Sequence, residues 1–107
     1  MDVRDVALAH VLSLEIPKAA NQRIILVSDL ITPQLVVNII RKHFPQLHNR
    51  IAEGNPDQIL PKGVHPTGWN RSKSFEIFGD GWGYVGLEKS LVDTVKSILD
   101  LEKKWRM

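Results

Sequence analysis

Ile24-Ile25-Leu26-Val27 decides the fold, because four consecutive apolar residues need cover on both faces. Three of the four are β-branched and the run is short, so residues 23–28 are predicted to form a strand inside a parallel sheet. A parallel neighbour needs a crossover of about a dozen residues or more, and only the weak stretch 74–78 competes for that place. Each orphaned backbone group would cost roughly 1–3 kcal/mol. We therefore expect residues outside this chain to complete the sheet.

Two amphipathic helices are predicted on either side of this run. Residues 3–15 have helical spacing, with Asp2 as the cap and Pro17 as the stop. Their predicted buried stripe is Val3, Val6, Ala7, His10, Val11 and Leu14. Thr32 and Pro33 open a second helix, which Pro45 ends. Its predicted buried stripe is Leu35, Val36, Ile39, Ile40 and Phe44.

The second half of the chain begins with a long loop. Residues 45–71 carry prolines and glycines throughout, and long loops of this kind are often functional or disordered. Residues 72–78 are predicted to form a short helix closed by Gly79. The terminal helix is predicted over residues 87–105, with an apolar face in which Trp105 anchors the end. The rest of that face is Leu91, Val92, Val95, Ile98, Leu99 and Leu101.

Composition excludes several classes of protein. The 107-residue chain is 43% apolar and 24% charged, as in ordinary globular domains. Its 14 basic and 12 acidic side chains are interspersed, which argues against a nucleic-acid partner. There is no cysteine, the histidines lack metal-ligand spacing, and no apolar run approaches the length of a membrane span. We expect a cytoplasmic protein with no metal site and no membrane partner.

Several segments, in order, resemble extended short-chain dehydrogenases/reductases of the NAD-dependent epimerase/dehydratase type. The nearest group is the fungal NADPH-dependent aldehyde and ketone reductases of the methylglyoxal-reductase and dihydroflavonol-reductase-like kind. The resemblance covers almost the whole chain. Its segments are Asp2-Val3-Arg4-Asp5-Val6-Ala7 with His10-Val11, Gln22-Arg23, Arg41-Lys42-His43-Phe44-Pro45, Glu53-Gly54-Asn55-Pro56, Ser72-Lys73-Ser74, and the terminal helix from Leu87-Glu88-Lys89-Ser90 onward.

The resemblance implies an α/β fragment over residues 1–107. This would be the mostly helical, substrate-side C-terminal lobe of a Rossmann-type enzyme, with one buried strand belonging to a larger parallel sheet. Its partners would be the missing N-terminal Rossmann domain, which holds NADPH, and a small carbonyl substrate. No catalytic or cofactor-binding residue can be placed here, because Tyr84 is followed by Glu88 rather than lysine four residues on. The chain alone is expected to bind no cofactor and to show no turnover.

Candidate sites have a structural and a functional interpretation. Residues 81–86 spell GxGxxG before a helix, but no βαβ unit surrounds them, so a turn is expected. Asp2, Arg4 and Asp5 are interpreted as helix-capping and interdomain residues, and His10 as a packed histidine. Trp69, in the long loop, is the substrate-side candidate.

Two departures from the family pattern concern the C-terminal lobe. Asn70 stands near the usual aspartate, and the glycine-rich link 80–86 is longer than usual. Two other functions stay open. One is a non-catalytic, α-rich binding module that uses its exposed strand or helix faces. The other is an epimerase or dehydratase of the same family.

Overall fold

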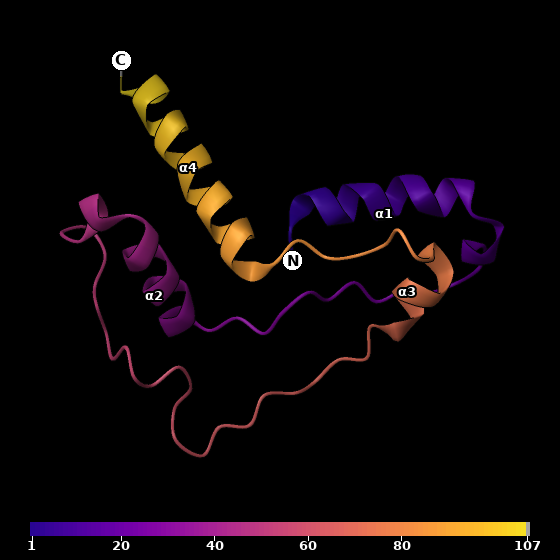
Figure 1. Ribbon diagram of the computed structural model, residues 1–107, viewed down its shortest axis with the longest axis horizontal. Coiled ribbons are helices and arrows are strands. Elements are labelled where there is room, and N and C mark those ends of the chain that lie inside the picture. The colour runs from indigo at the N-terminus through magenta and orange to yellow at the C-terminus, as the bar shows by residue number, and fades with distance from the viewer. Residues whose placement is uncertain (107) are drawn as a thin grey trace. The chain divides into compact units, whose positions relative to one another are not determined.

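The computed structural model describes residues 1–106, which contain four α-helices and two short 3-10 helices (Figure 1). In chain order these are α1 (Val3–Glu15), η1 (Pro17–Ala19), α2 (Pro33–His43), η2 (Pro45–Leu47), α3 (Ser72–Phe78) and α4 (Leu87–Trp105). The helix bounds follow the sequence signals, because each signal acts on backbone groups that a helix end leaves unpaired. The long Pro- and Gly-rich stretch between η2 and α3 forms no regular element.

Local chemistry accounts for the helix ends. The Thr32 hydroxyl accepts a hydrogen bond from the Leu35 amide at 3.2 Å, which caps α2, and Pro33 occupies the first turn. The short helix α3 ends at Gly79, whose φ of 83° suits glycine because a Cβ would be strained there. The Gly79 amide donates to the Phe75 carbonyl at 3.0 Å.

The chain folds as two compact units. The first comprises residues 1–29 and 66–87. Its core is a small apolar cluster in which α1, η1, α3 and the link before α4 meet: Ala9, Ala19, Ile77, Phe78 and Trp82, with Leu12, Ile16, Ile24, Leu26 and Tyr84 packed against it. The aromatic rings contact one another, with the Phe78 and Trp82 centroids 4.7 Å apart.

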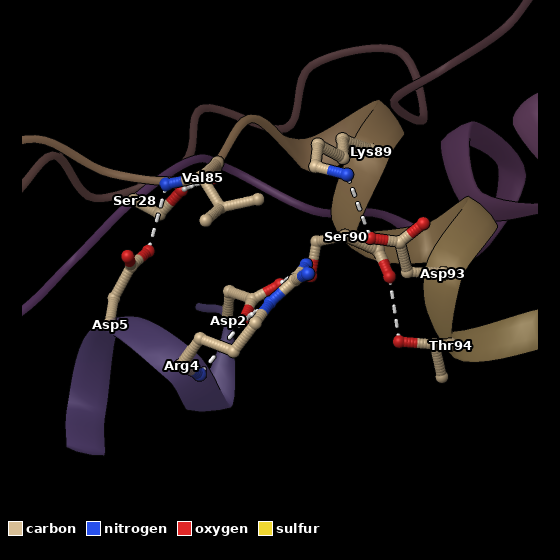
Figure 2. Close-up of polar contacts among 9 residues, drawn as sticks. All are labelled: Asp2, Arg4, Asp5, Ser28, Val85, Lys89, Ser90, Asp93 and Thr94. Carbon is tan, nitrogen blue, oxygen red and sulfur yellow. Dashed lines mark hydrogen bonds and ion pairs between the residues drawn. The ribbon is translucent and has the colours of Figure 1, made fainter. Parts of the chain in front are cut away.

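The second unit comprises residues 30–65 and 88–106. Phe44 and Leu47 are its buried apolar residues. Ion pairs tie α4 to the preceding part of this unit. The Arg50 guanidinium makes two hydrogen bonds of 3.1 Å to the Glu102 carboxylate, and His43 Nε2 lies 2.7 Å from Glu88 Oε1. Within α4, Lys89 pairs with Asp93 at 3.0 Å (Figure 2).

The predicted buried strand is not present. Residues 22–32 form no helix and no strand, and Ile25 is 41% exposed. The prediction that both faces are covered was wrong for this chain. Ile24 and Leu26 pack on the first unit's core, whereas Ile25 faces away from it. A strand requires a hydrogen-bonded neighbour, and residues 1–106 supply none to this segment.

The predicted buried stripe of α1 was also wrong. Val3 and Leu14 are 77% and 91% exposed, while Asp5 and Ala9 are buried. At about 100° per residue, Asp5, Ala9 and Leu12 lie on the opposite side of the helix from the predicted stripe. The small Ala9 side chain lets this side approach the core. The helix therefore has two apolar sides, of which this chain covers one.

Trp105 does not anchor α4, because its side chain is 83% exposed. Leu101, one turn earlier, is also exposed. Among the helices of residues 1–106, none combines the length and the apolar content that crossing a membrane requires.

Candidate functional site

Asp2 and Arg4 form an ion pair at the start of α1. Asp2 Oδ1 accepts hydrogen bonds from the Arg4 amide at 2.8 Å and from Arg4 Nε at 2.9 Å. Asp2 Oδ2 accepts from Arg4 Nη2 at 2.8 Å (Figure 2). The carboxylate is 5% exposed, so these charge-assisted bonds offset its desolvation. The pair fixes the direction in which the chain enters the helix.

Asp5 binds the link that precedes α4. Its Oδ2 accepts a hydrogen bond from the Val85 amide at 2.8 Å, as Figure 2 shows. The Ser28 hydroxyl lies 3.4 Å from the Val85 carbonyl and 2.8 Å from Asp29 Oδ2. The Val85 amide is thus held by a side chain from a distant part of the sequence, whereas the single Ser28 hydroxyl hydrogen is directed to the nearer Asp29 carboxylate. Asp5 positions the link within the first unit.

The GxGxxG sequence at residues 81–86 does not fit a dinucleotide phosphate. Such a site needs free backbone amides that point at the anion. Here the Val85 amide is bonded to the Asp5 carboxylate, and the Trp82 amide donates to the Gly79 carbonyl at 3.1 Å. A carboxylate at this position would repel a phosphate. The turn instead places the Trp82 ring in the core.

His10 lies at the edge of an open apolar groove. Its Nδ1 is 2.8 Å from the Val6 carbonyl, a contact in which the nitrogen donates, and the residue is exposed rather than packed on a buried stripe. The groove, of about 440 Å³, runs between α1 and residues 22–32, the extended segment. It is lined by Ala9, His10, Ser13, Leu14, Ala19, Gln22, Ile24, Leu26 and Phe78.

The extended segment has an unpaired backbone edge. Within residues 1–106, no backbone amide from residue 23 to residue 31 donates a hydrogen bond. Of the carbonyls in that range, those of Val27 and Ser28 accept one, in both cases from the Arg71 side chain. Donors and acceptors left unpaired at a partly buried site are a template for another strand.

Arg71, which the sequence reasoning missed, connects three parts of the first unit. Its Nη1 donates to the Ser28 carbonyl at 2.6 Å, and its Cζ lies 5.0 Å from the centre of the Tyr84 ring. The Tyr84 hydroxyl contacts Ser74 Oγ at 2.8 Å, and that oxygen donates to the Arg71 carbonyl. Only the position of this arginine just before the Ser72-Lys73-Ser74 segment marked it in the sequence.

A polar stripe on α2 holds the long loop, and sequence reasoning missed it as well. Gln34 Nε2 donates to the Glu53 carbonyl at 2.9 Å, and its Oε1 accepts from the Asn55 amide at 2.8 Å. Two further side chains on the same helix face bind loop carbonyls: Asn38 to Pro56 at 3.1 Å, and Arg41 to Ile51 at 2.6 Å. The spacing i, i+4, i+7 was the available signal.

The electrostatics of the second unit rest on two surface carboxylates. Hydrogen bonds from His43 and then Lys42 hold the pKa of Glu88 below its ordinary value. The hydrogen bond from Arg50 lowers the pKa of Glu102 in the same way. These groups stay charged near neutral pH and link α4 to its neighbours.

The predicted substrate-side residue is an exposed side chain of the long loop. Trp69 is 65% exposed in the loop before α3. In the described part of the chain, no cluster of three or more histidine and acidic side chains could hold a metal ion. Tyr84, the chain's one tyrosine, is engaged with Ser74 and Arg71.

The relatives of this chain are fungal reductases and oxidoreductases, as the sequence resemblance predicted, and the chain is similar to their C-terminal part. It is 32% identical over 100 residues to a ketoreductase of Aspergillus niger, covering 94% of this chain and 28% of the relative. It is 29% identical over 102 residues to the NADPH-dependent methylglyoxal reductase of Saccharomyces cerevisiae, covering 95% of this chain and 29% of the relative.

The fold agrees with that similarity. The crystal structure of the yeast methylglyoxal/isovaleraldehyde reductase complexed with NADPH superposes with a TM-score of 0.83 at 29% identity. The match covers 96% of this chain and 33% of the crystallised one. This chain thus spans about a third or less of the length of the reductases that it matches. No protein-family model matches it.

Proposed function

We propose that this chain is the C-terminal, substrate-side part of an NADPH-dependent reductase of aldehydes or ketones. The observation that supports this most directly is its similarity, over nearly its whole length, to the C-terminal part of reductases about three times as long. In this proposal, a preceding dinucleotide-binding part holds NADPH and carries the reacting side chains. This chain docks onto it and shapes the cleft for the carbonyl substrate.

The extended segment is the first element of the proposed docking surface. Ile24 and Leu26 pack on the core of the first unit, and the backbone beside them is unpaired. We propose that a strand of the preceding part pairs with this edge. Pairing would satisfy the free amides, each of which is worth about 0.5–1.5 kcal/mol when bonded. It would also place Ile25, which is 41% exposed in this chain, on a face of the completed sheet.

The outer side of α1 is the second element. Val3, Val11 and Leu14 are 77%, 52% and 91% exposed, although they share one side of a regular helix. Covering a side chain of this size is worth about 1.5–3 kcal/mol. A helix with two apolar sides is typical of a layer that is packed between two others. The preceding part would supply the second layer.

The side chains of this chain would position the cleft rather than react. Asp2, Arg4 and Asp5 hold α1 and the link before α4 in place, and His10 borders the docking groove. Trp69 is exposed in a long loop, where a ring can cover an apolar substrate group. Hydride transfer and proton donation belong to the preceding part in this scheme.

Reconstitution tests the proposal. The chain is produced together with the S. cerevisiae NADPH-dependent methylglyoxal reductase truncated before the region that this chain matches. We expect a stable complex that binds NADPH and oxidises it when methylglyoxal is added, while neither piece alone does so. The matched variants are Val11→Asp on the outer side of α1 and Lys96→Asp on an exposed position of α4. The first is expected to prevent assembly and the second to leave it intact.

Two results would contradict the proposal. One is turnover by the isolated 107-residue chain. The other is a cooperatively melting, monodisperse isolated chain that does not bind the truncated reductase; this would favour the non-catalytic binding module. An epimerase or dehydratase would leave NADPH unconsumed in the reconstituted complex. The ketoreductase and the methylglyoxal reductase among the relatives favour the reductase.

A further inference from the structure

Arg71 contacts the extended segment at one point, where two adjacent carbonyls converge. Its Nη1 lies 2.6 Å from the Ser28 carbonyl oxygen and 3.3 Å from the Val27 carbonyl oxygen. In a regular strand, the backbone groups of successive residues point to opposite sides, so one nitrogen cannot reach both carbonyls. The chain therefore departs from strand geometry at Val27 and Ser28. The guanidinium occupies the place where the carbonyls meet.

The arginine is itself fixed. Its guanidinium stacks near two rings, with Cζ 5.0 Å from the Tyr84 centroid and 5.8 Å from the Phe75 centroid. Its own carbonyl accepts a hydrogen bond of 2.8 Å from Ser74 Oγ, and Ser74 is completely buried. The backbone and the head group of the side chain are thus both held within the first unit. A residue held at both ends can impose a bend on a flexible neighbour.

We propose that Arg71 ends the pairable edge at Leu26 and so sets the register of the partner strand. The inference rests on the proposed function, because the occupant is a β-strand of the preceding part of the reductase. The edge from Arg23 to Leu26 has free donors and acceptors, whereas beyond it the two carbonyls are already bonded to a cation. The partner strand therefore pairs with residues 23–26 and separates from this chain at Val27, where the Arg71 guanidinium binds the backbone carbonyls.

A lysine at position 71 would end the pairable edge less effectively than an arginine. The planar guanidinium can bind carbonyls and stack on the Tyr84 ring at the same time, while an ammonium group is a point charge. A defined end of the paired region matters because a shift of one residue in strand register would turn Ile25 toward the core and Ile24 outward. Arg71 is a positioning residue, which acts on register through the backbone.

The test compares Arg71→Met with Lys73→Met, which removes a nearby exposed charge that makes no hydrogen bond or ion pair within residues 1–106. Each full chain is combined with the truncated yeast reductase, and amide hydrogen exchange is followed by mass spectrometry with overlapping peptides. In the unchanged chain and in Lys73→Met, protection is expected to stop at Leu26. In Arg71→Met it is expected to extend past Ser28, because the Val27 and Ser28 carbonyls are then free to pair. Arg71→Lys should fall between.

An unchanged boundary of protection in Arg71→Met overturns the inference while leaving the proposed function intact. Failure of the unchanged chain to bind overturns both. A measurement on the isolated chain does not depend on the partner. A longer free edge promotes edge-to-edge association, so Arg71→Met is expected to self-associate at lower concentration than Lys73→Met in light scattering. Equal self-association also counts against the role of Arg71.

Discussion

Gly54 and Gln34 should be energetically coupled, because the loop passes Gln34 at a residue that cannot carry a side chain. Gly54 has φ of 65°, and a Cβ built there would overlap Gln34 Oε1. Gln34 makes two hydrogen bonds to the loop, one to the Glu53 carbonyl and one from the Asn55 amide. Gly54→Ala must therefore both strain the backbone and displace the amide that holds the loop.

The magnitudes follow from those two effects. A non-glycine residue in this conformation costs roughly 1–2 kcal/mol. The two solvent-exposed hydrogen bonds of Gln34 together contribute about 1–2 kcal/mol. Gln34→Ala should then destabilise the closed loop by about 1–2 kcal/mol, and Gly54→Ala by about 2–4 kcal/mol. The double variant should cost no more than Gly54→Ala alone, which is a coupling of about 1–2 kcal/mol.

Amide exchange at Gln58 measures these values. Its amide donates to the Asn55 carbonyl at 3.1 Å, a bond that neither substitution removes, so its protection reports loop opening in the full chain. Gly63 is the control, because it also has positive φ, at 82°, but a Cβ there would meet no atom within 4 Å. Gly63→Ala should be additive with Gln34→Ala. Additivity of Gly54→Ala with Gln34→Ala would refute the reasoning.

Three further outcomes are expected. Asp2→Ala should destabilise α1 by about 1 kcal/mol or more through loss of its cap, whereas Asp2→Asn keeps an acceptor and most of the stability, as amide exchange in the first turn will show. Thr32→Val should lower the free energy of opening at the start of α2, measured by amide exchange, by about 1 kcal/mol, whereas Thr32→Ser should leave it unchanged. Equal effects of the two substitutions would exclude the cap. The contact of Glu88 with His43 should stabilise the fold above the carboxyl's ordinary pKa of 4.5 and weaken as pH falls through its lowered pKa. His43→Gln should bring the pKa of Glu88 in an NMR titration closer to that ordinary value, and an unchanged pKa would contradict the assignment.

The helices could be predicted from sequence because their signals are local. Thr32-Pro33 and Pro45 act on the backbone groups next to them, and the helix they bound starts and stops there. The interactions that build the candidate site could not be predicted in this way. Arg71 meets Ser28 across 43 residues of sequence, and Asp5 meets Val85 across 80. Nothing in the spacing of either pair specifies the contact, which depends on how α1 and α3 pack.

The sequence by itself determined where the helices lie; that the run Ile24 to Val27 belongs beside another strand stays a prediction. Hydrophobic pattern and capping are properties of neighbouring residues, so no partner is needed to recognise them. Only the tertiary structure decided which side of α1 is buried, and that the run stays unpaired within residues 1–106. Burial and strand pairing depend on surfaces brought together from distant positions. In this chain those surfaces cover one side of α1 and leave the other, with the free backbone edge, exposed.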